Sequence, residues 1–247
     1  MNIGAQLYTL RDQMNNDPAA TLTRVAEIGY KHVQVSGFSY DASELKSLCD
    51  NLGLQIQLTH TPPERILEDT AAVIAEHKRM ACPYVGLGGM PFEYRCTGDA
   101  KKFIEDFTPA MQAFAGAGLK FQYHNHAFEF ECFGGVSMYD ALINHSDPAL
   151  LGFTLDTYWV AWAGLEVPAL IKRMAGRIDV CHLKDLAIIE NQQRYAPVGH
   201  GNLNWPAILA AFEEIGTQFA FVEQDDCYDE NPLDELQKSY TYLEETP

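Results

Sequence analysis

The sequence lacks any uninterrupted apolar run long enough to cross a membrane, which takes about 18 to 20 residues. Its first seven residues, Met1-Asn-Ile-Gly-Ala-Gln-Leu7, contain neither the basic start nor the apolar stretch of a secretory signal. Both absences argue against insertion into a membrane and against export. We therefore expect a chain that acts in the cytoplasm and has no membrane partner.

Paired cysteines are also missing. The six cysteines are scattered, and no two stand in the Cys-x-x-Cys spacing of zinc or redox motifs. We expect reduced and mostly buried thiols, as is usual for proteins of the cytosol. The six residues are Cys49, Cys82, Cys96, Cys132, Cys181 and Cys227.

Positive charge is scarce. The chain has 17 Lys and Arg residues and 34 Asp and Glu residues, which gives a net charge of -17. Such a surface repels phosphate backbones, so nucleic acid is not an expected partner. The glycine cluster Gly86-Leu-Gly-Gly89 lacks the Lys-Ser/Thr of a phosphate-binding loop, and a turn is the simpler interpretation.

What the sequence does contain is a regular alternation of short apolar runs with longer amphipathic segments. This pattern is typical of βα units around a parallel sheet. Eight runs each precede a helical segment, and 247 residues match the usual length of a (β/α)8 barrel. We predict one such domain over residues 1–247, with a doubly wound open sheet as the alternative. The predicted strands span 3–7, 32–35, 54–60, 84–87, 120–126, 151–156, 178–184 and 219–223, and a polar loop follows residue 184.

Three of the later strands end in side chains that can bind a divalent metal. These side chains are Asp156, His182 and Glu223. Because alternate side chains of a strand face the same side, each polar group would project from the C-terminal end of a buried strand. The active site of a barrel lies at those ends. An Asp, a His and a Glu together there suggest one metal site with oxygen and nitrogen ligands.

Several motifs in order resemble those of the sugar isomerase/epimerase barrels, also called the xylose isomerase-like or AP-endonuclease 2 family. Nearly the whole chain takes part, and the ordered set is far more specific than any single motif. The motifs are Gly4-Ala-Gln-Leu-Tyr-Thr-Leu-Arg11, Tyr123-His-Asn-His-Ala-Phe-Glu129, Leu155-Asp-Thr157, His182-Leu-Lys-Asp185, Val198-Gly-His-Gly201 and Val222-Glu-Gln224.

The resemblance implies a divalent metal held by Glu, Asp, His and Glu from strands five to eight. Carried over by position, the ligands are Glu129, Asp156, His182 and Glu223, and the ion is Mn, Mg, Zn or Co. Glu129 lies beyond the predicted end of strand five, so Glu131, His124 or His126 could take its place. The implied substrate is a small sugar or polyol.

In such enzymes the difficult step is removal of a proton next to a carbonyl, and a metal that holds the carbonyl and hydroxyl oxygens stabilises the enediolate. The resemblance gives the acid and base roles to Glu129 and Glu223, one on each face of the substrate. Lys184 shares the interior side of its strand with His182 and is a candidate oxyanion donor. The alternative for Lys184 is a salt bridge with Asp185.

Other residues are candidates for substrate contacts, each with a structural alternative. The histidines could contact the substrate or lie in the core. The tryptophan could form an apolar floor for a sugar ring or pack a helix against the barrel. The arginine could contact a hydroxyl or phosphate group or lie in a solvated loop. His200 stands where relatives often carry an acidic residue. The candidates are His60, His124, His126, Trp159, Arg194 and His200.

We expect a metal-dependent sugar isomerase or epimerase, and a lyase or dehydratase of a 3-keto sugar or inosose is the alternative because elimination begins with the same proton abstraction. An abasic-site endonuclease would need more zinc ligands and a basic face, which the net charge opposes. A non-catalytic sugar-binding barrel is a fourth possibility. Barrels of this kind often form homo-oligomers, but no surface stripe in the sequence identifies one.

Overall fold

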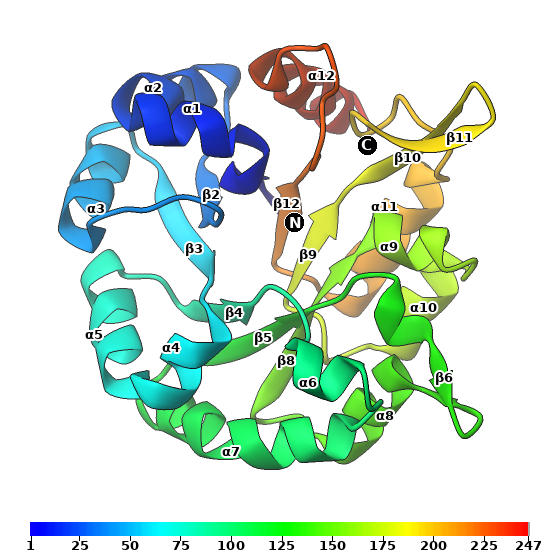
Figure 1. Ribbon diagram of the computed structural model, residues 1–247. Helices are drawn as coiled ribbons and strands as arrows, with labels where there is room; N and C mark the ends of the chain where they lie inside the picture. Colours follow the sequence, from blue (N-terminus) through cyan, green and yellow to red (C-terminus); the bar gives the residue numbers. More distant parts are fainter. Residues whose placement is uncertain (247) are drawn as a thin grey trace.

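Eight parallel strands close into a barrel in the computed structural model, which describes residues 1–246 (Figure 1). Around the barrel the order is β1-β12-β9-β8-β5-β4-β3-β2, so consecutive barrel strands are neighbours. The prediction of a (β/α)8 barrel is confirmed, and the open-sheet alternative is wrong. The barrel strands are β1 (Asn2–Gln6), β2 (His32–Val35), β3 (Gln55–His60), β4 (Tyr84–Leu87), β5 (Lys120–His124), β8 (Leu151–Asp156), β9 (Val180–Leu183) and β12 (Phe219–Val222).

Helices surround the barrel and bury one face each against it (Figure 1). In α7 (Ala100–Gly116), Phe103, Phe107 and Phe114 are fully buried, as their helical spacing predicts. The side chain of Asn204 accepts the Ala207 N–H and so caps the start of α11 (Trp205–Ile215). The other helices are α1 (Arg11–Asn16), α2 (Pro18–Ile28), α3 (Ala42–Asn51), α4 (Pro63–Glu68), α5 (Thr70–Met80), α6 (Phe92–Arg95), α8 (Met138–His145), α9 (Thr157–Trp162), α10 (Val167–Arg173) and α12 (Pro232–Glu245).

The inside of the barrel changes from apolar to polar along the strand direction. A small cluster of Leu58, Tyr84, Val180 and Phe221 fills the interior and is separate from the main core under the helices. Gly4 faces this cluster, since a Cβ there would lie 2.6 Å from the Phe221 ring. Two residues further along each strand, on the same face, Leu58 gives way to His60, Val180 to His182 and Phe221 to Glu223. The polar end of the interior is therefore the C-terminal mouth.

Two predicted helices are each interrupted. The segment after β3 forms α4 and α5, which Asp69 separates, and the segment after β8 forms α9 and α10. Gly164 lies in the second break with a φ of +79°, a left-handed conformation that ends a helix easily. Continuous apolar periodicity on both sides conceals such short breaks in the sequence.

The predicted polar loop after residue 184 is wrong in part, because it contains an antiparallel hairpin. Strands β10 (Asp185–Ile189) and β11 (Gln192–Ala196) pair across a two-residue turn. Glu190 and Asn191 both have positive φ, at 51° and 61°, as in the type I′ turns that favour tight hairpins. Neither residue is glycine, so the usual sequence signal of the turn is absent. A second, shorter hairpin joins β6 (Cys132–Phe133) to β7 (Val136–Ser137).

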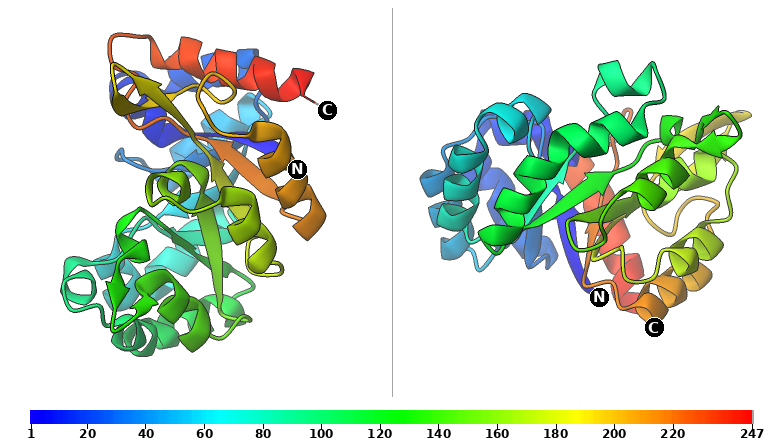
Figure 2. Two further views of the ribbon diagram at one scale, coloured as in Figure 1. Left: turned by 90° about the vertical axis from the view of Figure 1, so that its right-hand side faces the viewer. Right: turned by 90° about the horizontal axis from the view of Figure 1, so that it is seen from below.

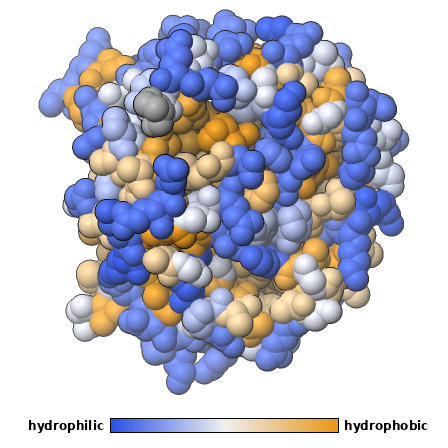
Figure 3. Space-filling model, turned by 180° about the vertical axis from the view of Figure 1, so that it is seen from behind, coloured by the Kyte–Doolittle hydropathy of each residue, from blue (hydrophilic) through white to orange (hydrophobic). Residues whose placement is uncertain are grey.

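The two ends of the barrel differ. Both views in Figure 2 place the start of β1 and the β10–β11 hairpin at opposite ends of the molecule. Seen from behind, the face around the strand N-termini shows hydrophilic side chains with scattered hydrophobic patches between them (Figure 3). Within residues 1–246, no helix is long and apolar enough to span a bilayer. All six cysteines are free and four are buried, as expected from the sequence.

Candidate metal centre

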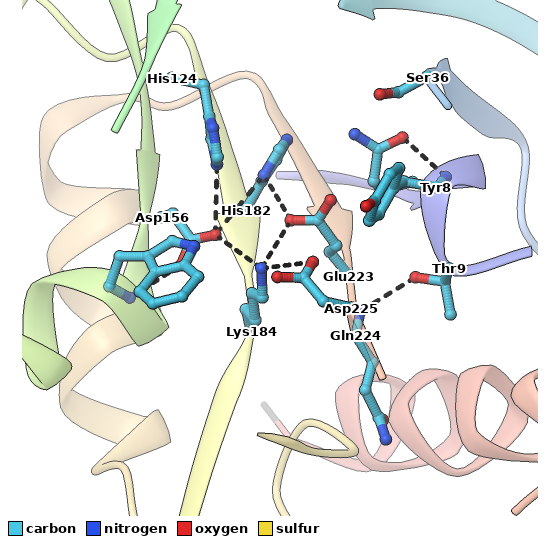
Figure 4. Close-up of polar contacts among 12 residues, drawn as sticks. Tyr8, Thr9, Ser36, His124, Asp156, His182, Lys184, Glu223, Gln224 and Asp225 are labelled. Carbon is cyan, nitrogen blue, oxygen red and sulfur yellow. Dashed lines mark hydrogen bonds and ion pairs between the residues drawn. The ribbon is translucent and has the colours of Figure 1, made fainter. Parts of the chain in front are cut away.

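Four side chains gather at the mouth of the barrel in a geometry suited to a metal ion. His124, Asp156, His182 and Glu223 each offer one ligand atom, and these atoms lie within 4.8 Å of one another. They come from four neighbouring strands or the residue just after one, in the order β5, β8, β9 and β12 (Figure 4). All four side chains are buried. The parallel register explains the convergence, since Asp156 pairs with His182 and Phe221 pairs with His182 from the other side.

Hydrogen bonds orient both imidazoles with one ring nitrogen facing the centre. His124 Nδ1 lies 3.0 Å from the carbonyl oxygen of Gly88, which can only accept, so this nitrogen carries the proton. The opposite ring nitrogen, Nε2, faces the centre 3.3 Å from Asp156 Oδ2. His182 Nε2 donates to Gln34 Oε1 at 2.7 Å. Its Nδ1 faces Glu223 Oε2 at 3.0 Å. Burial lowers the pKa of His182, but the carboxylates of Glu223 and Asp156 outweigh it and raise this pKa to about 9. Outer partners that fix the tautomer in this way are typical of metal-binding histidines.

The charges around the cluster also favour a divalent cation. Lys184 Nζ lies 2.7 Å from Asp225 Oδ1, 3.2 Å from Glu223 Oε2 and 3.5 Å from Asp156 Oδ2. Three carboxylates thus meet one ammonium and the imidazole of His182 in a desolvated site, so negative charge is in excess. Buried charge of this kind is costly unless it is neutralised. The mixed oxygen and nitrogen donors and this charge excess together fit a divalent ion.

Lys184 is held as a cation. Burial alone would lower the pKa of its ammonium group, but the carboxylates of Glu223, Asp156 and Asp225 raise it well above the ordinary value. Trp159 and Tyr195 each place a ring centroid 5.2 Å from Nζ, which adds cation–π attraction. The predicted alternative, a salt bridge with Asp185, is wrong. The Asp185 carboxylate instead accepts backbone N–H groups of the loop after β11 and the indole N–H of Trp205.

A cavity of about 410 Å³ opens above the cluster. Its wall mixes ionic and imidazole groups with backbone of the glycine turn after β4, which suits a small polar ligand. Burial, followed by the charge of His124, lowers the pKa of His126 to about 3. Burial also lowers the pKa of His60 well below its ordinary value. Two neutral imidazoles therefore face this space. The cavity is lined by Tyr8, Ser36, His60, Thr61, Pro62, Pro63, Leu87, Gly88, Gly89, His124, His126, Lys184, Glu223 and Asp225.

The structure places Glu129 away from this centre. Glu129 lies in a short 3-10 helix, η2 (Phe128–Phe130), and is fully buried. Its carboxylate points back toward the end of β5. Oε1 accepts the Tyr123 hydroxyl at 2.6 Å and Oε2 accepts the His126 backbone N–H at 2.7 Å. The cluster contains His124 in the position that the resemblance gave to Glu129. His124 was among the alternatives that the sequence left open for this ligand.

We expect Glu129 to make the fold less stable as the pH rises. Burial raises the pKa of Glu129 from 4.5 to about 7, and the bonds from Tyr123 and His126 only partly oppose this. The folded state thus holds the proton more tightly than the unfolded chain, so the stability contribution is full below about pH 4.5 and declines up to about pH 7. Relative to Glu129→Gln, the wild-type protein should lose about 3 kcal/mol of unfolding free energy across this window.

Urea unfolding of both proteins between about pH 4 and 8, with saturating metal, measures this difference. The Gln variant should also keep its metal, because Glu129 lies outside the cluster. A parallel pH dependence in the two proteins would contradict the burial argument, and metal loss would restore the ligand role that the sequence predicted.

The remaining candidates separate into two groups. His60, at the end of β3, and His126 line the cavity, and the Trp159 ring lies 5.4 Å from that of His126. Arg194 instead lies on β11, where its guanidinium stacks 4.9 Å above the Tyr228 ring. His200 is exposed in the turn after β11. Neither Arg194 nor His200 lines the cavity above the cluster.

Some residues of the site were missed from the sequence. Asp225 stands two positions after Glu223 and could have been found by the same alternation that selected Lys184. Gln34 lies in β2, and its contact with His182 joins residues 148 positions apart, so no local signal indicates it. Tyr8 enters from η1 (Leu7–Leu10), a single turn that the sequence does not distinguish from a strand end.

Comparison with known proteins agrees with the fold. A family model described as "Xylose isomerase-like TIM barrel" matches residues 22–246. The chain belongs to this family. No curated protein matches the sequence. The resemblance inferred from the motifs of the xylose isomerase-like barrels is thus confirmed, over nine-tenths of the chain.

Solved structures share the fold of this xylose isomerase-like barrel at low sequence identity. A sugar phosphate isomerase/epimerase from Parabacteroides distasonis is 24% identical with a TM-score of 0.86, over 99% of this chain and 94% of that one. A D-psicose 3-epimerase from Clostridium cellulolyticum is 14% identical with a TM-score of 0.75, over 100% and 99%. A "probable 3-DHS dehydratase" from Bacillus anthracis is 12% identical with a TM-score of 0.76, over 100% of both chains. At these identities the likeness shows the fold.

Proposed function

We propose that the protein is a metal-dependent isomerase or epimerase of a keto sugar or a related polyol. The observation that carries this proposal is the buried cluster of two carboxylates and two imidazoles at the floor of a polar cavity. Membership of the xylose isomerase-like family and the epimerase among the structural neighbours support it. The cytoplasm is the proposed location.

His124, Asp156, His182 and Glu223 would hold one divalent ion, Mn, Mg, Zn or Co. When bound, such an ion polarises a carbonyl oxygen and orients the neighbouring hydroxyl group. The chain supplies the remaining chemistry. Lys184, kept protonated by its carboxylates, donates a hydrogen bond to the oxygen on which negative charge develops.

Glu223 is the proposed base. Its Oε2 faces His182 and Lys184, whereas Oε1 has no partner among the described residues and can accept a proton. His60 ends β3 and His126 follows β5, and each of these strands is three strands away from β12 around the barrel. Their neutral imidazoles lie across the cavity from Glu223, and we propose that they transfer the proton on the opposite face of the substrate. The resemblance gave this role to Glu129, which lies outside the cluster.

Incubation with a panel of ketoses in deuterated water, after loading with metal, tests this function. We expect solvent deuterium at the carbon next to the carbonyl, together with an epimer or aldose product. The dehydratase neighbour makes elimination the second candidate, since it begins with the same abstraction, and it would give loss of water and an unsaturated product. Absence of both exchange and elimination would favour a non-catalytic sugar-binding barrel.

A further inference from the structure

A second cavity adjoins the one above the metal centre. It has a volume of about 670 Å³ and shares Pro63, Gly89 and His126 with the first cavity. The two cavities therefore adjoin at these three residues, with His126 between the metal side and this space. The far wall comes from α6, η2, the residues just before each of them, and α9. It includes Met90, Pro91, Arg95, Ala127, Phe128 and Trp159.

Arg95 brings an unpaired positive charge to this second cavity. Its guanidinium stacks 3.9 Å from the Phe128 ring centroid, and that ring in turn stacks on His126 at 5.5 Å with an interplanar angle of 11°. Arg65 and Arg173 pair with carboxylates, whereas no described carboxylate forms an ion pair with Arg95. Glu129, next to Phe128 in the chain, has both carboxylate oxygens occupied by hydrogen bonds from Tyr123 and His126.

Arg11, Arg79, Arg177 and Arg194 also form no ion pair with a described carboxylate, so what sets Arg95 apart is its place in the wall of this cavity. Stacking on Phe128 holds the guanidinium plane while its N–H groups stay free for a planar or tetrahedral anion.

Two buried polar atoms in the same wall also lack partners. Trp159 Nε1 can only donate a hydrogen bond, and His126 Nδ1 can donate or accept one. Both atoms are buried without a partner among the described residues, and both side chains line the second cavity. Buried polar atoms are almost always satisfied in folded proteins, so partners supplied by a ligand are the simplest explanation. Together with Arg95 they give this space the donors that an oxyanion needs.

We propose that the second cavity is an anion subsite, in which Arg95 and the Trp159 indole N–H receive a phosphate or carboxylate at the far end of the substrate. The substrate class is thereby an acidic sugar derivative that reaches from the metal centre past His126. This inference rests on the proposed function for the position of the reacting end. It does not rest on which of the two reactions, isomerisation or elimination, takes place there.

Calorimetric binding to the metal-loaded protein at low salt tests the subsite, with D-glucitol, D-glucitol 6-phosphate and D-gluconate as probes. We expect at least one of the anionic probes to bind more tightly than D-glucitol, and the stronger of the two identifies the preferred anion. Arg95→Gln should weaken the binding of that probe roughly five- to tenfold and leave the affinity for D-glucitol unchanged. Because binding is measured without turnover, the result is independent of the deuterium exchange that tests the function.

Arg79→Gln is the matched control, since Arg79 is also exposed and lies on α5, away from both cavities. It should alter none of the three affinities. If Arg95→Gln and Arg79→Gln weakened binding of the anionic probe equally, the effect would come from the overall charge of the protein and the subsite would be overturned. So would an anion preference that survives Arg95→Gln but disappears in Arg194→Gln, because Arg194 is the arginine that the sequence suggested for this role. Equal affinity of the wild-type protein for all three probes would overturn it as well.

Discussion

The His182→Ala protein is expected to bind Mn²⁺ at least about a hundredfold more weakly than the wild-type protein. His182 is fully buried at the centre of the cluster, and its Nδ1 faces both Glu223 and Asp156. Alanine removes this ligand nitrogen and leaves Lys184 as the remaining partner of the two carboxylates. Metal analysis after dialysis and competition with a fluorescent chelator would measure the change in affinity.

A milder variant separates metal binding from folding. Gln34→Leu keeps every proposed ligand but removes the acceptor that fixes the His182 tautomer, and it should weaken binding about 10- to 100-fold. His145→Ala, at the exposed end of α8, should have no effect and serves as the control. Unchanged metal affinity in both His182→Ala and Gln34→Leu would show that the ion binds elsewhere.

Glu223→Gln is expected to lower the rate of solvent-deuterium exchange into substrate by about 10²- to 10⁴-fold. The amide has nearly the same shape as the carboxylate but cannot take a proton from carbon. It also removes one of three negative charges around Lys184, so metal affinity should fall and the assay needs saturating metal. Single-turnover exchange with wild-type and variant protein at equal metal occupancy gives the comparison.

Substrate affinity in the same variant distinguishes catalysis from binding. If Glu223 is the base, sugar binding at full metal occupancy should change far less than the rate of exchange. A rate close to that of the wild-type protein would remove Glu223 from the proton transfer. His60 and His126 would then be the groups to replace.

The sequence was sufficient wherever the function depended on regular strands. Two-residue alternation placed Asp156, His182 and Glu223 on the interior face at strand ends, and the barrel then brought them together. Alternation also placed Lys184 correctly, although its partner was predicted to be the adjacent Asp185 instead of Asp225. The error arose because adjacent residues of an extended chain face opposite sides, which the alternation itself implies.

Where the chain leaves its strands, the sequence was not sufficient. The position of Glu129 depends on the turn after β5, where a 3-10 helix returns the carboxylate to Tyr123. The hydrogen bond between Gln34 and His182 depends on closure of the whole barrel, because β2 and β9 are distant in the chain. Arg95 reaches its cavity through α6, a four-residue helix with no distinctive pattern. Tertiary contacts, and no local preference, determine all three positions.

Anomalous diffraction from crystals grown with Mn²⁺ tests the central claim most directly. We predict one strong peak per chain at the C-terminal mouth of the barrel, coordinated by His124, Asp156, His182 and Glu223, with the Glu129 carboxylate still bonded to Tyr123. A peak coordinated by Glu129, or no peak among these four side chains at saturating Mn²⁺, would contradict the account.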